Sequence, residues 1–221
     1  MIDPSVYQTP PGTKAGTKHY RAWVGPPQRY DKIAAMQFGT LTSLGLRETH
    51  HVLDLGCGSL RGGRLLITYL LPDRYCGIEP EAWLIEAGFE YELGHDIKDI
   101  KRPLFDHNRD FDLGVFDRKF DFIIAQSVFS HAALWQIEQC LASAYTVMHD
   151  DSIFIATYRK GEKDHTKLEW RYPGCTFYRE ETMVRVAHEA GLSCETIQPN
   201  VLWSSPWLLY RKEIVDTEVS E

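Results

Sequence analysis

The sequence predicts an α/β fold in which a mainly parallel sheet carries helices on both faces. Short apolar runs typical of strands alternate with longer stretches whose apolar residues recur every three or four positions, the spacing of an amphipathic helix. Residues 51–79 contain the clearest unit: a strand, a glycine-rich turn, a helix and a second strand. Strands that alternate with helices in this way form parallel sheets whose two faces are covered by the helices.

The individual elements follow from local patterns along the chain. Apolar residues recur at helical spacing in three stretches, 28–41, 134–148 and 183–190, and Gly191 ends the last of them. Beyond the opening unit, strands are expected at 103–106, 120–127, 151–158 and 207–211. The strand at 103–106 has the weakest signal, because the surrounding sequence is rich in charge and has no sustained apolar run.

The glycine-rich turn carries the strongest functional signal. Residues 52–58 read Val-Leu-Asp-Leu-Gly-Cys-Gly, and the second strand ends in Glu79. Glycines let the backbone approach a ligand closely, and a carboxylate at the tip of the second strand can accept from both hydroxyls of a ribose. Arg61 stands where a dinucleotide fingerprint needs its third glycine, and the chain has no G-x-x-x-x-G-K-[ST] phosphate loop. The unit therefore predicts a nucleoside-containing cofactor without a pyrophosphate or triphosphate.

Residues 52–58 resemble motif I of the class I S-adenosylmethionine-dependent methyltransferases, in which two apolar residues precede Asp-x-Gly-x-Gly. The resemblance continues at 120–127, which is similar to the motif IV strand, and at 151–158 and 207–211, similar to the next strand and to the last, antiparallel one. It implies a Rossmann-like seven-stranded methyltransferase sheet, an enzyme, and S-adenosylmethionine as the cofactor. Leu60 departs from the pattern, since many relatives carry a further glycine there.

The resemblance also assigns residues to the cofactor. Gly56 and Gly58 would pass beneath its methionine part, and Glu79 would hold the ribose. Residues 108–112 resemble the adenine-contacting segment, in which a carboxylate accepts from the exocyclic amine and an apolar neighbour packs on the ring; a solvated acidic loop is the alternative. Asp112 is the second choice for that carboxylate. The expected cofactor-binding residues are Asp54, Gly56, Cys57, Gly58, Glu79, Asp110, Phe111 and Gln126.

Candidates for catalysis and acceptor binding follow the later strands, because ligands of open α/β sheets sit at the carboxyl ends of the strands. His131 lies shortly after the strand at 120–127, and an ordinary histidine pKa of ~6.5 suits removal of a proton from a hydroxyl or amine. The alternative is that it caps or packs the next helix. The connection 159–178 is unusually long and aromatic. With the N-terminal aromatics it is expected to roof an acceptor pocket, the candidates being Tyr20, Tyr30, Tyr158, Trp170 and Tyr178.

Composition sets the domain organisation. A chain of 221 residues with 43% hydrophobic content can bury one sizeable core. Residues 1–27 are rich in proline and glycine and are expected to form an irregular extension and candidate lid, 28–212 the methyltransferase domain, and 213–221 an acidic tail. The five cysteines do not have metal-ligand spacing, so the sequence predicts no metal. The cysteine usage also fits reduced thiols, and the chain has neither an apolar run of membrane-span length nor a signal-peptide pattern; a cytoplasmic protein is therefore expected.

The net charge of −7 argues against nucleic acid as a partner, because such binding depends on clustered Lys and Arg. We therefore expect methyl transfer to a nucleophile, most of all a hydroxyl, on a small molecule of natural-product or sugar type. The alternatives are an RNA or protein methyltransferase, a non-catalytic S-adenosylmethionine-binding protein, and a short-chain-type oxidoreductase, although the Tyr-x-x-x-Lys pair of that last family is absent. The sequence predicts no particular oligomeric state.

Overall fold

The computed structural model describes residues 9–198 and 206–213 and is built around a seven-stranded sheet of order β3-β2-β1-β4-β5-β7-β6. Strands β1 to β5 run parallel, and β7 is antiparallel to both of its neighbours. The strands are β1 Val52–Leu55, β2 Tyr75–Ile78, β3 Leu104–Asp106, β4 Phe120–Ala125, β5 Met148–Thr157, β6 Leu192–Ile197 and β7 Trp207–Lys212. This topology confirms the predicted fold class, including the weakly signalled β3.

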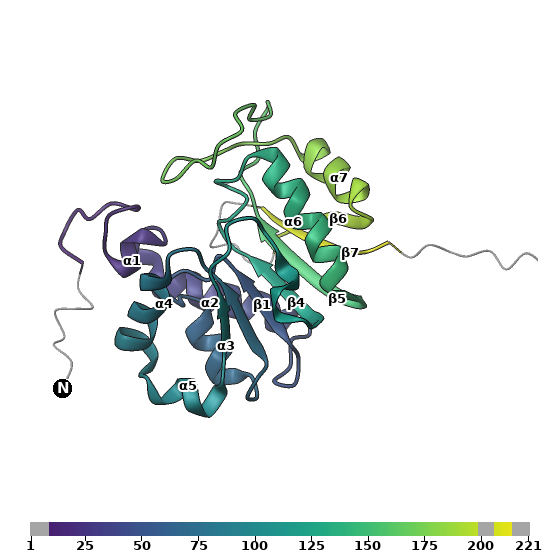
Figure 1. Ribbon diagram of the computed structural model, residues 1–221. Coiled ribbons are helices and arrows are strands. Elements are labelled where there is room, and N and C mark those ends of the chain that lie inside the picture. The colour runs from purple at the N-terminus through teal and green to yellow at the C-terminus, as the bar shows by residue number, and fades with distance from the viewer. Residues whose placement is uncertain (1–8, 199–205, 214–221) are drawn as a thin grey trace, which may run out of the picture.

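Helices cover both faces of the sheet (Figure 1). On one face, α2, α3 and α4 contribute residues such as Ile33, Leu66 and Ile85 to the core, and on the other α6 and α7 contribute Ile137 and Met183. The helices are α1 Tyr20–Trp23, α2 Tyr30–Ser43, α3 Gly63–Tyr69, α4 Ala82–Gly88, α5 Asp96–Lys101, α6 Leu134–Val147 and α7 Glu180–Glu189, with the short turns η2 Pro27–Arg29, η3 Phe89–Leu93 and η4 Leu113–Phe116. In the described ranges, every helix is too short or too polar to span a membrane.

The register of the central strands positions the site. β1 and β2 are buried at every residue, as expected for parallel strands with both faces covered. Leu55 of β1 pairs with Ile78 of β2, so that both strands end at the same level. The glycine-rich turn after β1 and Glu79 after β2 therefore leave the sheet side by side.

Residues 9–27 of the N-terminal extension are more ordered than their composition predicts. They contain α1, a single turn capped by the His19 ring, which accepts from the Arg21 backbone N–H. Tyr20 is buried, and its hydroxyl donates to a carboxylate oxygen of Glu92 over 2.9 Å. Docking of aromatic side chains onto the core supplies the order that local periodicity does not. Of the predicted acidic tail, Glu213 pairs with His188, and residues 214–221 lie outside the described residues.

Candidate cofactor and active site

The glycine-rich turn adopts a conformation that favours glycine. Gly56 and Gly58 have φ of +67° and +57°, in the left-handed region. A Cβ on Gly58 would lie 2.5 Å from a methyl group of Val24, and one on Gly56 would lie 2.7 Å from a methyl group of Val128. Leu60, the position at which the sequence departs from the resembled motif, is also left-handed at +58°. Gly56 is exposed while Gly58 is covered, so the turn presents backbone to a ligand at Gly56.

Glu79 is fastened to this turn by two backbone N–H groups. One carboxylate oxygen accepts from Gly58 over 3.0 Å and the other from Glu81 over 2.9 Å. Burial raises the pKa of the carboxyl, whereas these two bonds act in the opposite direction. Because a carboxylate offers about four acceptor positions, roughly two remain after these bonds. Glu79 thus lies where the sequence predicts it, with acceptor capacity left for two hydroxyl groups.

Asp54 and Cys57 lie beneath the turn and contact protein groups. The Asp54 carboxyl accepts from the Tyr75 hydroxyl over 2.9 Å, and burial raises its pKa to about 7. Cys57 is buried against Gly77, and a Cβ on Gly77 would lie 2.9 Å from the Cys57 sulfur. Burial raises the pKa of the Cys57 thiol well above its ordinary value. Both residues therefore support the loop from beneath, whereas the sequence places them among the expected cofactor-binding residues.

Gln126, at the end of β4, holds Arg61, a residue that the sequence analysis does not include among the site residues. The Gln126 amide oxygen accepts from the Arg61 guanidinium and, over 3.3 Å, from the Gln37 amide. Its amide nitrogen donates to the Ser127 hydroxyl over 2.7 Å. A second guanidinium nitrogen of Arg61 donates to the Val24 carbonyl over 2.5 Å. The sequence feature that could have marked Arg61 as a site residue is its position in the glycine turn, where the dinucleotide pattern has its third glycine.

His131 is held in one tautomer by the loop 159–178. Its Nδ1 lies 2.6 Å from the Gly174 carbonyl oxygen and 3.0 Å from that of Arg171. Since carbonyl oxygens only accept, Nδ1 carries the proton and Nε2 keeps a lone pair. Burial lowers the pKa of the ring. His131 is therefore a neutral imidazole with a basic Nε2 near the carboxyl end of β4.

Aromatic rings join His131 to the N-terminal extension. The His131 ring centroid lies 5.8 Å from that of Trp170 and 5.0 Å from that of Tyr172. The Tyr172 ring in turn lies 5.5 Å from the Trp23 ring, and its hydroxyl donates to the Trp23 carbonyl. Segments about 150 residues apart in sequence thus meet next to the candidate base.

Comparisons with known proteins agree with this geometry. Residues 28–197 match the family model described as a methyltransferase domain. The chain belongs to this methyltransferase family. Magnesium protoporphyrin IX methyltransferase from Synechocystis PCC 6803 with bound SAH has a similar structure (TM-score 0.60, 14% identity, 84% of this chain and 86% of that one covered). So do the CcbJ methyltransferase from Streptomyces caelestis (0.64, 14%, 96% and 100%) and the glycopeptide N-methyltransferase MtfA complexed with SAH (0.60, 11%, 80% and 87%). The predicted enzyme class is confirmed.

Most of the aromatics expected to line an acceptor pocket in this methyltransferase have other contacts. Tyr158 and Tyr178 are fully buried in the core, because the chain turns inward after β5 and before α7. Tyr30 is buried too, and its hydroxyl donates to the Ser59 carbonyl of the glycine turn over 2.9 Å. Together with Tyr20, these residues support the structure from within. Trp170 keeps 45% of its surface exposed beside His131.

The residues expected to contact adenine lie in different environments in the structure. Asp110 is exposed, while its carbonyl accepts from Gln139 over 2.5 Å. Phe111 is left-handed at φ +57° and packs in the core with 9% exposure, which leaves little of its ring for a ligand. Asp112 caps η4 by accepting from the Gly114 N–H over 2.9 Å. Asp110 therefore remains the candidate carboxylate, and Asp112 has a structural role.

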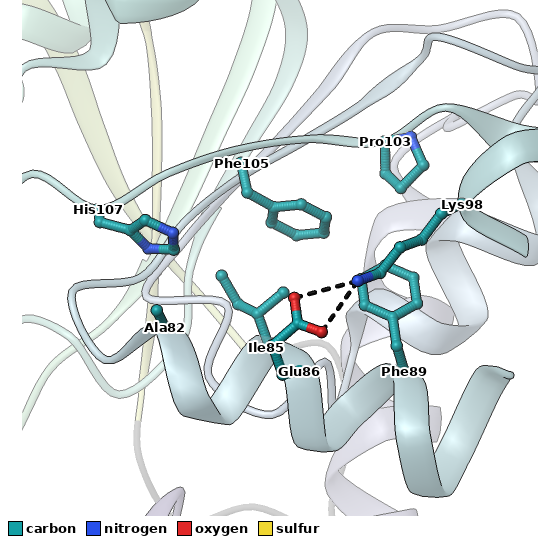
Figure 2. Close-up of a pocket in the computed structure, with 8 residues that line it drawn as sticks. All are labelled: Ala82, Ile85, Glu86, Phe89, Lys98, Pro103, Phe105 and His107. Carbon is teal, nitrogen blue, oxygen red and sulfur yellow. Dashed lines mark hydrogen bonds and ion pairs between the residues drawn. The ribbon is translucent and has the colours of Figure 1, made fainter. Parts of the chain in front are cut away.

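A cavity of about 160 Å³ lies between α4, α5 and β3 (Figure 2). The ion pair between Lys98 and Glu86, at 3.0 Å, lies on one side of it, and the Lys98 ammonium sits 4.4 Å from the Phe89 ring centroid. Neither the glycine turn nor the Glu79 side chain lines this cavity. Among the described residues, no three His, Cys, Asp or Glu side chains gather in a way that could hold a metal.

Proposed function

We propose that this methyltransferase moves the methyl group of S-adenosylmethionine to a hydroxyl group on a small molecule. The observation that carries the proposal is the fixed tautomer of His131 near the carboxyl end of β4. A hydroxyl acceptor must lose a proton, and a neutral imidazole with a free Nε2 suits that task. The acceptors named for two similar structures, magnesium protoporphyrin IX and a glycopeptide, support a small-molecule acceptor.

The residues of the glycine turn fit the cofactor. Glu79 retains acceptor positions for the two ribose hydroxyls, and Gly56 presents exposed backbone that a side chain would block. Asp110 offers an exposed carboxylate for an exocyclic amine. When bound, S-adenosylmethionine supplies an activated methyl group on a sulfonium, so that the protein needs only to orient the acceptor, exclude water and remove a proton.

His131 performs the proton step. Its Nε2 accepts the proton of the acceptor hydroxyl, and the imidazolium that results keeps its Nδ1–H directed at the Gly174 and Arg171 carbonyls. These carbonyl dipoles stabilise the developing positive charge. The rings of Trp170 and Tyr172 lie against the imidazole and shield these two sides of it from water.

Turnover of His131→Ala tests this role. With radiolabelled S-adenosylmethionine and a panel of phenols and sugars as acceptors, we expect the wild-type protein to label a small molecule and His131→Ala to lose about 10²–10⁴-fold in turnover. Binding of S-adenosylhomocysteine by calorimetry should stay unchanged. His95→Ala, which alters an exposed histidine paired with Glu90, is the control and should keep full activity. Full activity in His131→Ala, or label found only in RNA or protein, would refute the proposal.

We also propose that the N-terminal extension and the loop 159–178 form a cover over the site. Val24 lies on Gly58, Gly16 lies against Pro173, and the Tyr172 hydroxyl bonds to the Trp23 carbonyl. Such a cover excludes water during methyl transfer. Hydrogen exchange in residues 10–30 and 159–178 should slow when S-adenosylhomocysteine binds, while the central strands stay unchanged.

The matched variant for the cover is Tyr172→Phe, which removes only the hydroxyl bond to Trp23. It should speed exchange in both segments without ligand. Identical exchange with and without S-adenosylhomocysteine in the wild-type protein would show that the two segments are ordinary packing.

A further inference from the structure

Arg61 is a buried cation that pairs with no acidic side chain in residues 9–198 and 206–213. Only 6% of its surface is exposed. No carboxylate oxygen of the described residues lies within 4.0 Å of its guanidinium nitrogens, the limit for an ion pair. Arg64, three positions later, pairs with both Glu92 and Asp31. Arg21 likewise pairs with Glu92. The arginines around the glycine turn therefore differ: two have their charge met by carboxylates and Arg61 does not.

The partners that Arg61 does have are neutral. They are the Val24 carbonyl and the Gln126 amide oxygen, and the guanidinium Nε has no partner in the part of the chain that the structure describes. Burial lowers the pKa of the guanidinium to about 10, so it stays charged at neutral pH. The nearby Asp54 carboxyl is engaged by Tyr75. A buried charge is costly unless an opposite charge compensates it, which makes this position favourable for an incoming anion.

A second unpartnered group lies beside the same turn. The Gln37 amide oxygen is buried and accepts no hydrogen bond from any described residue. It lies next to Gly62, where a Cβ would approach it to 2.6 Å, and its own amide nitrogen donates to Gln126, the residue that holds Arg61. Gln126 thus links the Arg61 guanidinium, which lacks an anionic partner, to the amide of Gln37, whose oxygen lacks a donor. This pair complements a carboxylate and an ammonium on the same carbon, the end group of an amino acid.

We propose that Arg61 binds the α-carboxylate at the methionine end of the cofactor and that Gln37 accepts from its α-ammonium. The inference rests on the proposed function, since it concerns the same cofactor. The guanidinium Nε has no partner among the described residues and would donate to the carboxylate in a charge-assisted bond, while the bond to the Val24 carbonyl is kept. The side chain of Val24 also covers Gly58, so cofactor binding and the position of the N-terminal extension are coupled through this one residue.

Calorimetry with two ligands tests the assignment. S-adenosylhomocysteine carries the amino-acid end, and 5′-methylthioadenosine has the same nucleoside and sulfur without it. We expect Arg61→Gln to weaken binding of S-adenosylhomocysteine roughly 10- to 150-fold, the range for hydrogen bonds to charged groups, and to leave methylthioadenosine unchanged. Arg64→Gln removes a neighbouring arginine whose charge is already paired, so it should leave the preference between the two ligands unchanged.

Three outcomes separate the possibilities. If the wild-type protein binds neither ligand, the proposed function fails. If it binds both and Arg61→Gln keeps the wild-type preference for S-adenosylhomocysteine, the assignment of Arg61 is overturned and the function stands. Should Arg61→Gln not fold, the decarboxylated analogue of S-adenosylhomocysteine provides the same comparison in the wild-type protein. A loss below about threefold for that analogue would then overturn the assignment.

Discussion

Replacing Asp54 by Asn should change how the stability of the protein depends on pH. Burial raises the pKa of this carboxyl to about 7 in the folded protein, against an ordinary value of 3.8. The folded state therefore binds a proton between these pH values that the unfolded state releases. For an acid whose pKa is raised by folding, the stabilisation is fully present below the unfolded pKa and is lost as pH rises through the folded pKa.

The size of the effect follows from the two values. At 1.36 kcal/mol per pKa unit, the difference corresponds to about 4 kcal/mol over the whole titration, of which about 3 kcal/mol falls between pH 5 and pH 8.5. Asn cannot ionise and still offers an acceptor to the Tyr75 hydroxyl. The free energy of unfolding of the wild-type protein, relative to that of Asp54→Asn, should therefore fall by about 3 kcal/mol from pH 5 to pH 8.5.

Urea denaturation of both proteins at several pH values measures this difference. The control is Asp73→Asn: the bond to Arg102 keeps the pKa of that exposed carboxyl below its ordinary value, so it stays charged from pH 5 upward in both states. The difference between the wild-type protein and this control variant should be constant with pH. If the difference in unfolding free energy between the wild-type protein and Asp54→Asn were also constant with pH, Asp54 would be ionised in the folded protein. Burial would then not raise its pKa.

Two further variants test the turn. Glu79→Ala should weaken binding of S-adenosylhomocysteine by about 1–3 kcal/mol, measured by calorimetry, because the ribose loses charge-assisted acceptors. The control is Glu81→Ala, which retains the backbone N–H that Glu79 uses and should leave the affinity unchanged. Gly58→Ala should lower the free energy of unfolding by about 1–3 kcal/mol in urea denaturation, since a Cβ at φ +57° would meet Val24 at 2.5 Å. Wild-type stability in that variant would show that the extension moves aside freely.

The site as a whole was only partly predictable from sequence, and the difference lies in the range of the interactions. The proximity of Glu79 to the two glycines was predictable because motif spacing places them at the ends of adjacent parallel strands, which strand register brings together. Tyr158 and Tyr178 were misplaced in an acceptor pocket. Aromatic residues in a long loop have no periodicity that separates a buried ring from one that lines a pocket, and only packing in the tertiary core buries Tyr158 and Tyr178.

The sequence by itself predicted six of the seven strands, the glycine-rich turn and the enzyme family, because each depends on residues a few positions apart, but it did not predict β6. The tertiary structure decided which polar groups are left without partners. Arg61 meets Val24 and Gln126, 37 and 65 positions away, and the proton on His131 is assigned by carbonyls about 40 positions later. Burial and hydrogen-bond partners are properties of the packed chain, so neither the unpaired charge of Arg61 nor the free Nε2 of His131 is encoded in any local pattern.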